Sequence, residues 1–414
     1  MELKPGYKQT EMGVIPDEWD VKPLGSLTSL LTNGFVGTAT TAYVESEDGV
    51  LYIQGYNVEE NGFNLHGIKR VSKSFHARNQ KSCLQPGDLL TIQTGDIGVT
   101  TVVPPELAGA NCHALIISRL NKRTCEPGFY CHYFNSERGR IAFKEIETGS
   151  TMKHLNCSDM KRLLLPSPPI EEQCAIARAL SDVDVLLDAL DQLIGKKRDL
   201  KQATMQQLLT GQTRLPGFSG EREVKQLHES TDCLDSVRVP LNEAQRAQMK
   251  GDYPYCGANG VLDYVNSYVI DDDIILIAED GGYFDEYEHR PIAYRMSGKC
   301  WVNNHAHILK AKEGFDQGFL FYSLVHKNIL SFLASGTRAK LNKSEMWKIE
   351  VNVPVALTEQ TAIAEVLSDM DAELAALEQR RDKTRALKQG MMQELLTGRI
   401  RLPLPDAMKD AKTL

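Results

Sequence analysis

One segment of this chain occurs twice, and the two copies lie 187 positions apart. Residues 172–216 and 359–403 align without a gap, and 27 of the 45 positions are identical. The copies end in LKQATMQQLLTGQTRLP and LKQGMMQELLTGRIRLP. So long a period is typical of a duplicated domain and not of a solenoid. The sequence therefore predicts two units, each a variable block followed by a near-constant block.

Weaker similarities relate the two variable blocks. The similar pairs are DLLTIQTGDIG (88–98) with DIILIAEDGGY (273–283), NCHALIIS (111–118) with NNHAHILK (303–310), and GSTMKHLNCSDM (149–160) with GTRAKLNKSEM (336–346). Near the start of each unit, Val21 matches Val224 and Leu24 matches Leu227. We expect the two blocks to share one fold while differing in most side chains.

The near-constant blocks have the pattern of two long helices with one apolar seam each. Apolar residues recur at spacings of four and three, as in a coiled coil. The predicted seam residues are Ile176, Leu180, Val183, Leu187, Leu190, Ile363, Leu367, Met370, Leu374 and Leu377. Each helix is expected to span about 38 residues, roughly 57 Å, and to end at Gly211 or Gly398. A single exposed apolar stripe is unstable in water, so the helices are predicted to pack on each other, antiparallel and related by an approximate twofold axis.

The outer faces of the two helices also repeat. A seam needs only apolar character, yet polar residues such as Gln173, Asp182, Lys201 and Gln206 recur in the second copy. Two matching outer surfaces indicate that two copies of a common partner dock on the chain. The alternative is a coiled-coil spacer with no further role.

The variable blocks are predicted to be α+β. Short β-type runs separated by Gly, Pro and Asn dominate them, and helical stretches are expected near 128–146 and 316–334. The fold class is therefore α+β, with two similar domains separated by two long antiparallel helices. The predicted boundaries are 1–165 for the first variable domain, 166–212 for the first helical region, 213–355 for the second variable domain and 356–414 for the second helical region.

Charge is distributed unevenly along the 414 residues. The net charge is −8, but residues 61–165 carry 14 Lys and Arg against 8 Asp and Glu, a local excess that suits phosphate contacts. The second block is acidic, and its cluster Asp271–Asp273 is expected to form a solvated turn before a strand. No run reaches the roughly 18 apolar residues of a membrane span, and the first residues lack the apolar stretch of a signal peptide. We therefore expect a cytoplasmic protein.

No catalytic or metal-binding motif stands out. The sequence contains no GxxxxGK[ST] phosphate loop, and its nine cysteines form no CxxC pair. His113, His305 and His307 follow predicted strands and are interpreted as structural or ligand-contact histidines. We expect no metal, no cofactor and no catalytic residue in this chain.

The loops of both variable blocks carry side chains suited to recognising DNA. Amide groups read adenine in the major groove, and hydroxyl and basic groups before a helix start bind phosphate. The candidate DNA contacts are Gln54, Tyr56, Asn57, Gln93, Thr94, Asp96, Ser150, Thr151, Lys153 and His154 in the first block, and Tyr255, Asn259, Asp280, Tyr283, Asn304, His305, Thr337, Arg338 and Lys340 in the second.

Three features together resemble a known family. YKQTEMGVIPDEW near the start, the repeated EEQxAIAxxLSDxD…LKQxxMQxLLTGxxRLP, and the two dissimilar blocks between the copies resemble the specificity subunit of type I restriction–modification systems. The resemblance covers nearly the whole chain. It implies two target-recognition domains that each read one half of a split, asymmetric DNA site. It also implies two copies of a DNA adenine methyltransferase subunit on the helices, ATP-dependent restriction subunits on the larger assembly, and cofactor sites only in those partners.

The helices then act as a ruler for the spacer between the half-sites. One turn of DNA is about 34–36 Å, so two readers on a rod of comparable length can reach successive major grooves. Two other hypotheses stay open at this point. One is a DNA enzyme with duplicated domains, although the (N/D/S)PP(Y/F) element of an adenine methyltransferase is absent. The other is a protein-binding scaffold without a role on DNA.

Overall fold

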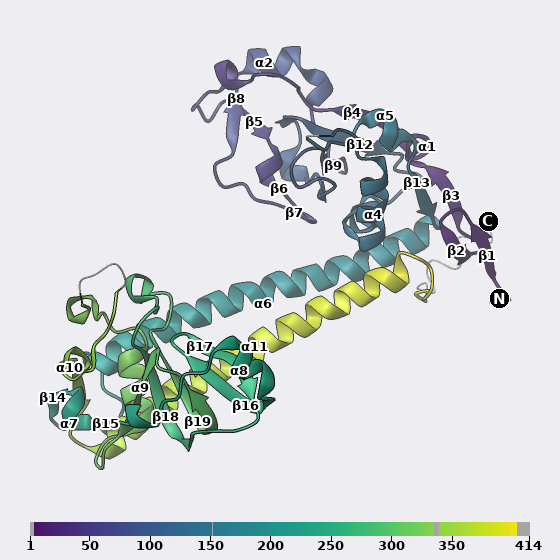
Figure 1. Ribbon diagram of the computed structural model, residues 1–414. Coiled ribbons are helices and arrows are strands. Elements are labelled where there is room, and N and C mark those ends of the chain that lie inside the picture. The colour runs from purple at the N-terminus through teal and green to yellow at the C-terminus, as the bar shows by residue number, and fades with distance from the viewer. Residues whose placement is uncertain (1–3, 151, 335–338, 404–414) are drawn as a thin grey trace. The chain divides into compact units, whose positions relative to one another are not determined.

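The computed structural model describes residues 4–150, 152–334 and 339–403, which form two compact units (Figure 1). The first unit combines 1–190 with 380–414, and the second consists of 191–379. The division falls inside both long helices, α6 (Ile170–Thr210) and α11 (Leu357–Leu395). Each unit contains sheets and helices, so the α+β class is confirmed.

The first unit begins with a hairpin and continues through two small sheets. Its elements before α6 are β1 (Tyr7–Thr10), β2 (Gly13–Pro16), β3 (Asp20–Pro23), α1 (Leu24–Leu27), β4 (Thr28–Asn33), β5 (Val50–Ile53), β6 (Val58–Glu59), β7 (Gly62–Phe63), β8 (Lys69–Val71), α2 (Lys73–Arg78), β9 (Leu89–Ile92), β10 (Thr100–Val102), β11 (Asn111–Cys112), β12 (Leu115–Leu120), α3 (Pro127–Asn135), α4 (Glu137–Ile146), α5 (Cys157–Arg162) and β13 (Leu164–Ser167). The larger sheet has the order β10-β9-β12-β4, and the smaller one β11-β5-β8. Every residue of β9 is buried, including Thr91, which explains why the strand does not alternate between apolar and charged residues.

The second unit is built around one six-stranded sheet with the order β15-β20-β18-β19-β16-β17. Its elements between α6 and α11 are β14 (Arg222–Gln226), α7 (Leu227–Ser230), β15 (Thr231–Cys233), α8 (Glu243–Gln248), β16 (Lys250–Gly257), β17 (Gly260–Val265), β18 (Ile270–Ala278), β19 (Ala293–Val302), β20 (Ala306–Ala311), α9 (Gln317–Val325), α10 (Lys343–Met346) and β21 (Glu350–Pro354). The central strand β18 buries Ile274–Ala278 completely. This burial places the core of the unit under that strand.

One local prediction needs correction. Asp271–Asp273 do not form a turn, because they lie inside β18. There Asp272 pairs with Lys310 of β20 and Asp273 with Arg295 of β19, so cations on the neighbouring strands neutralise them. The predicted helical stretch near 128–146 is confirmed. It consists of two helices, α3 and α4, because Ser136 follows the first and its hydroxyl caps the second by accepting from the N–H of Gly139.

The similarity near the start of each unit reflects the same local structure. Val21 and Val224 lie in β3 and β14, and each strand leads into a one-turn helix that begins at Leu24 or Leu227. The N–H of Leu24 donates to the carbonyl of Leu163 at 2.8 Å. The N–H of Leu227 donates to that of Ile349 at 2.9 Å. The expectation of a shared fold is met in this part of both units.

Both units pair the start of one long helix with the end of the other. In the first, Ile176 and Leu180 share a buried cluster with Leu395. In the second, Met205 and Leu208 share one with Ile363 and Leu367. The pairing is therefore antiparallel within each unit, as predicted.

The predicted seam residues all lie at least partly inside this packing. Those that are buried are Ile176, Leu180, Leu190, Ile363, Leu367 and Leu374, and those that are half-buried are Val183, Leu187, Met370 and Leu377. Charged pairs flank the seam: Lys388 bonds to Asp184 in the first unit, and Lys201 to Asp371 in the second. These four residues are two repeat-related pairs, because 184 and 371, like 201 and 388, differ by 187.

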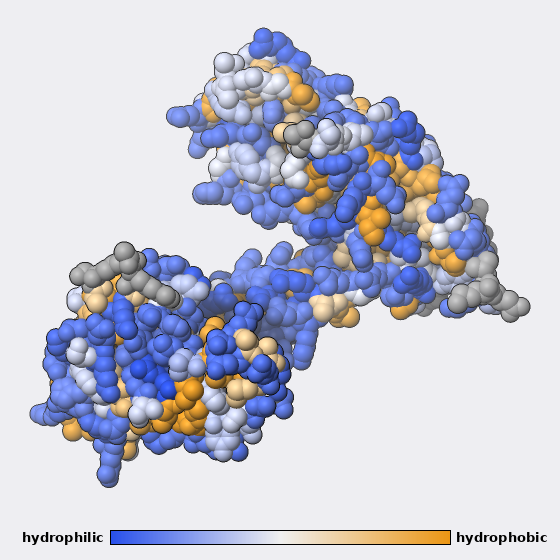
Figure 2. Space-filling model, viewed as in Figure 1, coloured by the Kyte–Doolittle hydropathy of each residue, from blue (hydrophilic) through white to orange (hydrophobic). Residues whose placement is uncertain are grey.

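Helix α6 ends directly before Gly211, as predicted, whereas α11 ends at Leu395, three residues before Gly398. Gly211 and Gly398 have φ of +78° and +69°, the left-handed conformation that a side chain disfavours. Helix α6 spans 41 residues and α11 spans 39, close to the predicted length. None of the helices in the described part of the chain is long and apolar enough to cross a membrane. Hydrophilic residues cover most of the face of each unit that Figure 2 shows.

Candidate nucleic-acid interface

A single hydrogen-bonding pattern attaches each variable domain to its long helix. The side-chain oxygen of Gln173 accepts from the N–H of Glu126 at 2.9 Å, and its amide donates to the carbonyls of Thr124 and Pro168. Both groups of this buried amide are therefore satisfied, which makes the junction rigid and specific.

Gln360 makes the same three contacts in the second unit. Its oxygen accepts from the N–H of Asp316 at 2.9 Å, and its amide donates to the carbonyls of Gly314 and Pro354. Both Glu126 and Asp316 cap the following helix, α3 or α9, with their carboxylates. The two variable blocks differ in most side chains, but each is attached to its long helix by the same set of hydrogen bonds.

In the second unit, the structure gathers several predicted DNA contacts around the end of β18. The imidazole of His305 lies 2.5 Å from a carboxylate oxygen of Asp280, and a β-bridge joins Asp280 to Lys340. The amide of Asn259 donates to the carbonyl of Gly281 at 2.9 Å. Four loops that are distant in the sequence therefore present amide, carboxylate, imidazole and ammonium groups at one place. Such a set can bind both base edges and phosphates.

The remaining predicted contacts of this unit lie in or beside the same loops. Tyr283 is half-buried, and the guanidinium of Arg290 covers its ring. Asn304 is exposed next to His305. Thr337 and Arg338 lie outside the described residues, as does Thr151 of the first unit.

A network of charged side chains lies between this cluster and the interior of the domain and supports it. His307 donates to Asp235 at 2.7 Å and to the carbonyl of Leu341 at 2.8 Å. Glu279 accepts from Arg238 and pairs with Lys340 at 2.9 Å. Lys340 is therefore attached through Glu279 to the interior of the domain.

The network keeps His307 protonated. Burial alone would lower the pKa of His307, but the hydrogen bond to Asp235 and its charge raise that pKa to about 9. Burial would raise the pKa of Asp235, and the bonds from His307 and from the N–H of Ile308 hold it at about 2. His307 is thus an imidazolium that neutralises a half-buried carboxylate.

Cys233, Asp235 and His307 also have the composition of a metal site, since their ligand atoms lie within 4.8 Å of one another. Both imidazole nitrogens are occupied, however, because each donates a proton to an oxygen acceptor. A metal ligand needs a free nitrogen lone pair. The hydrogen bonds at this place therefore fit a protonated histidine and not a metal ion.

Asn57 and Tyr255 are buried, at 0% and 1% exposure. The oxygen of Asn57 accepts from the N–H of Gln54, and its amide donates to the carbonyl of Asn64. The hydroxyl of Tyr255 accepts from the N–H of Leu241 and also donates to its carbonyl. These side chains hold their own loops together, so we assign them a supporting role in place of the predicted base contact.

In the first unit, the predicted contacts form two groups. The carbonyl of Gln93 accepts from the N–H of Leu155 at 3.0 Å, which brings the loop after β9 beside His154. Thr94, Asp96, Ser150 and Lys153 are exposed on these two segments.

The second group is Gln54 with Tyr56, which contact each other at 3.3 Å. The hydroxyl of Tyr56 also donates to the carbonyl of Gly67. Among the described residues, no hydrogen bond joins this group to Gln93 or His154.

The sequence patterns missed Arg238 and Glu279, which hold the second cluster in place. No motif contains Arg238, and it lies 41 positions before its partner. A local pattern cannot report such a pair, because only the folded sheet brings the two side chains together. The DG dipeptide at 280–281 was the single local signal nearby.

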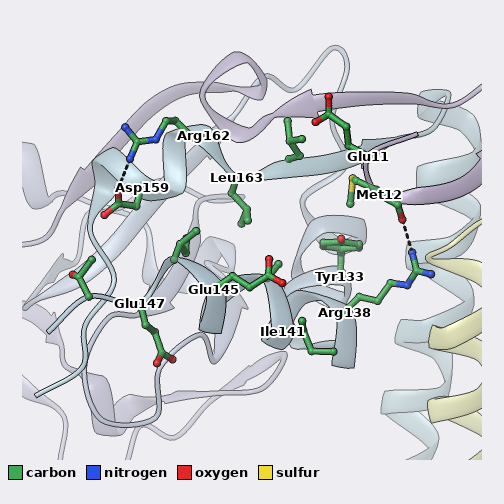
Figure 3. A pocket seen from close by; sticks show the side chains of 14 residues that line it. Glu11, Met12, Tyr133, Arg138, Ile141, Glu145, Glu147, Asp159, Arg162 and Leu163 are labelled. Carbon is green, nitrogen blue, oxygen red and sulfur yellow. Dashed lines mark hydrogen bonds and ion pairs between the residues drawn. The ribbon is translucent and has the colours of Figure 1, made fainter. Parts of the chain in front are cut away.

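A separate cavity of about 640 Å³ lies beside the N-terminal hairpin of the first unit (Figure 3). There Arg138 donates to the carbonyl of Met12 at 3.2 Å, and Arg162 to Asp159 at 2.6 Å. Acidic and apolar side chains from α4 and the hairpin line it as well, together with Tyr133 of α3 and Leu163 and Leu164 at the start of β13. None of the lining residues is among the predicted DNA contacts.

Comparison with known proteins decides the family. The family model described as the type I restriction modification DNA specificity domain matches residues 16–199 and again 223–385. The chain belongs to this specificity family. The two matched segments follow the two units of the internal repeat, and each contains one variable block with most of its helix.

Individual members of the specificity family match at moderate identity. The putative type I restriction enzyme MjaX specificity subunit of Methanocaldococcus jannaschii is 25% identical over 96% of this chain and 97% of its own length. A putative specificity subunit of Haemophilus influenzae is 36% identical, but over only 37% of this chain and 38% of its own length. The solved S subunit from M. genitalium has the same fold, with a TM-score of 0.63, 18% identity, and coverage of 95% of this chain and 98% of its own.

Proposed function

We propose that this protein is the DNA specificity subunit of a type I restriction–modification complex and has no catalytic site of its own. One observation carries the proposal. Gln173 and Gln360 make the same three hydrogen bonds, while the loops of the two variable domains differ in side chains, as in QTGDIG (93–98) and EDGGYF (279–284). To read two different half-sites of one DNA sequence, a protein needs two recognition surfaces that differ in side chains but are attached in the same way. The repeated junctions and the unlike loops meet this requirement.

The proposed reading surface of the second unit consists of Asn259, Asp280, Tyr283, Asn304, His305 and Lys340. In the first unit it consists of Gln54, Tyr56, Gln93, Thr94, Asp96, Ser150, Lys153 and His154. Exposed amide, imidazole and carboxylate groups discriminate bases by hydrogen bonding. Lysine and hydroxyl groups bind phosphates and fix the register of the protein on the duplex.

The partners are double-stranded DNA, two copies of an adenine methyltransferase subunit, and ATP-dependent restriction subunits. A solved structure with the same fold, 16% identical and with a TM-score of 0.53, comes from work on complex assembly of a type I system. The methyltransferase and nuclease chemistry belongs to the partners. The repeated outer faces of α6 and α11 support two equivalent docking positions.

The predicted division of labour accompanies this function. Residues 1–165 and 213–355 are the target-recognition domains, and 166–212 and 356–414 are the helical regions that set the spacer between half-sites. A complex of this kind acts on chromosomal and incoming DNA, so we place it in the cytoplasm.

The methylated sequence tests the proposal. The chain is expressed with its methyltransferase subunit in a host without other adenine methylation, and modified adenines are mapped by single-molecule sequencing. We expect one bipartite, asymmetric motif with a fixed spacer of unspecified bases. A continuous motif, or no methylation that depends on this chain, would contradict the proposed function.

A further inference from the structure

His113 of the first unit belongs to a short sequence pattern that the second unit repeats. The residues NCHA (111–114) match NNHA (303–306). The first set leads into β12, which pairs with β9, and the second leads into β20, which pairs with β18. His113 is therefore the sequence counterpart of His305, a member of the proposed reading surface of the second unit.

His113 lies beside Gln54 at one edge of the smaller sheet. Strands β11 and β5 are parallel and pair Cys112 with Ile53, so the residues that follow them, His113 and Gln54, come at the same edge. The N–H of His113 donates to the carbonyl of Ile53 at 2.8 Å. His113 thus joins the group of predicted contacts that consists of Gln54 and Tyr56.

The backbone after His113 is held in an unusual conformation. Ala114 has a φ of +47°, which residues with a side chain rarely adopt. Its N–H donates to the carbonyl of Phe35 at 3.0 Å, and the N–H of Phe35 donates to that of Cys112 at 2.8 Å. Such a conformation persists only where the surrounding structure holds it, and it occurs preferentially at functional sites. These bonds therefore fix the place of the imidazole.

A hydrogen bond from Tyr52 fixes the tautomer of His113. The Tyr52 hydroxyl lies 2.9 Å from Nδ1 and has no other hydrogen-bond partner among the described residues. Tyr52 is 0% exposed, and burial raises its pKa, so the phenol keeps its hydrogen. A buried O–H needs an acceptor, so Tyr52 donates to Nδ1. Burial also lowers the pKa of His113, and the neutral ring carries its one hydrogen on Nε2.

The Nε2–H group of His113 is free to bind a ligand. Within the part of the chain that the structure describes, Nε2 makes no hydrogen bond, and it is not a buried atom. His307, which serves the interior of the second unit, bonds through both of its ring nitrogens. His113 instead presents one uncharged donor of fixed position to the surroundings.

A basic segment lies against this edge of the sheet. Residues 61–87 contain no Asp or Glu and five cations, which are Lys69, Arg70, Lys73, Arg78 and Lys81. The segment forms β8 and α2, which lie with β5 in one part of the first unit (Figure 1). Helix α2 is attached to β11, because Nδ1 of His76 lies 2.6 Å from the side-chain oxygen of Asn111. Cations at this place attract phosphates, whereas the uncharged donor of His113 suits a base edge.

We propose that His113 is a specificity-determining residue of the first unit. Its Nε2–H donates to an acceptor on the major-groove edge of one base, and Tyr52 is the positioning residue that keeps the hydrogen on Nε2. Guanine, adenine and thymine offer acceptors in that groove, whereas cytosine offers an amino donor. The first unit therefore excludes cytosine at the position that His113 reads. This inference rests on the proposed function and adds a reading residue and the direction of its hydrogen bond.

The counterpart in the second unit has the opposite polarity. Nδ1 of His305 lies 2.5 Å from the carboxylate of Asp280, and a carboxylate only accepts. Nδ1 therefore carries the hydrogen, and Nε2 of the neutral ring is an acceptor. In the alignment of 88–98 with 273–283, Gly95 stands in the place of Asp280, so Tyr52 provides the partner in the first unit. One repeated histidine can thus read different bases in the two half-sites.

The methylated motif of a His113→Gln variant tests the proposal. The complete complex with the methyltransferase subunit is used, and the half-site of the first unit is the one that changes when residues 20–165 are exchanged. Glutamine offers a donor and an acceptor, so we expect selectivity against cytosine to fall about tenfold at one position of this half-site. The other half-site and the spacer should be unchanged. An unchanged motif, a change in the other half-site, or an equal loss at all sequences would overturn the inference.

Tyr52→Phe tests the tautomer and has a matched control. The variant keeps the ring but lacks the hydroxyl, so His113 can carry its hydrogen on either nitrogen, and the same position of the motif should relax. Tyr43→Phe removes a hydroxyl from a ring 6.0 Å from that of Tyr52 and leaves the bond to His113 intact. It should keep the parent motif. Equal effects of the two variants would show a merely structural role and reject the proposal.

Nitrogen NMR of labelled histidine in the complete chain gives a readout that does not depend on the folding of a His113 variant. We expect the Nε2–H form for His113 in the parent chain and a mixture of both forms in Tyr52→Phe, which identifies the signal. The Nδ1–H form or a charged ring in the parent chain would overturn the inference. A bipartite parent motif that His113→Gln leaves unchanged rejects this inference alone, whereas a continuous parent motif rejects the proposed function.

Discussion

Arg214 donates to both carboxylate oxygens of Glu359, with its Nε 2.6 Å from Oε1. Arg401 makes the same two-pronged contact with Glu172, where Nη2 lies 2.7 Å from Oε2. The repeat relates Arg214 to Arg401 and Glu172 to Glu359. Each near-constant block therefore ends in an arginine that closes on the glutamate beginning the helix of the other block.

The first prediction concerns this reciprocal pair. Glu359 is only 1% exposed, so Arg214→Met leaves a buried carboxylate that keeps a single weaker cation, Arg222 at 4.0 Å. We expect the second unit to lose about 3 kcal/mol of stability. Urea-dependent pulse proteolysis, with fragments assigned to each unit by mass spectrometry, measures the change. Adding Glu359→Gln should recover part of the loss, and equal stability of Arg214→Met and the parent chain would refute the account.

The pH dependence of the second unit is predicted to follow His307. Its folded pKa of about 9 lies above its ordinary value of 6.5. The folded unit therefore binds the proton more tightly, and this stabilisation is complete below pH 6.5 and lost as pH rises through 9. Asp235, Glu279 and Cys233 lie near the imidazole, and Arg238 pairs with both carboxylates. The positive charge that disappears at high pH is therefore one of those that balance the two carboxylates.

The measurement is the urea midpoint of the second unit between pH 6.5 and 9.5. It should fall across this window in the parent chain and be nearly constant in His307→Gln, which is less stable at neutral pH. His132→Gln is the control in the first unit, because burial lowers the pKa of His132 to about 4 and its titration lies outside the window. If the urea midpoint of the second unit in the parent chain stayed constant between pH 6.5 and 9.5, His307 would not be protonated in the folded unit.

The cluster at the end of β18 should separate base reading from phosphate binding. Asp280→Asn alters the group that orients His305. We expect methylation to fall about ten- to hundredfold, and recognition to change only at the half-site that the second unit reads. Lys340→Gln removes a cation, so DNA binding should weaken equally for all sequences and its salt dependence should fall by about one ion. Asp285→Asn, exposed in the same unit, is the control. If Asp280→Asn weakened all sequences alike, this aspartate would not take part in base reading.

The helices are predicted to measure the spacer. Four residues, about one turn of helix, are inserted after Gln192 and after its repeat partner Gln379, so that both helices lengthen together. The preferred spacer in the methylated motif should become longer while both half-sites stay the same. A changed half-site with an unchanged spacer would contradict this role of the helices.

The parts of the fold that depend on chain-local chemistry were predictable. The alternation of apolar residues from Ile176 and from Ile363 indicated the seam, and glycine at 211 and 398 marked both helix ends because only glycine adopts that backbone without strain. The strand at Leu89–Ile92 was visible as a short run of β-type residues, and all of them are buried.

The candidate site was predictable only in part. Asn57 and Tyr255 have the residue types of base-reading groups, but the same amide and hydroxyl can satisfy a loop backbone, and burial decides between the two uses. Asp272 looked like a residue of a solvated turn because Lys310, its partner, lies on another strand. Pairing across a sheet is a property of the fold, and no window of sequence contains it.

The most direct test of the two-reader account is an exchange of one recognition domain. Residues 20–165 are replaced by the equivalent block of a relative, with both long helices left unchanged, and the methylated motif is read by single-molecule sequencing. The account predicts that one half-site changes while the other half-site and the spacer are retained. A change in both half-sites would contradict it, because one block would then influence the reading of the other.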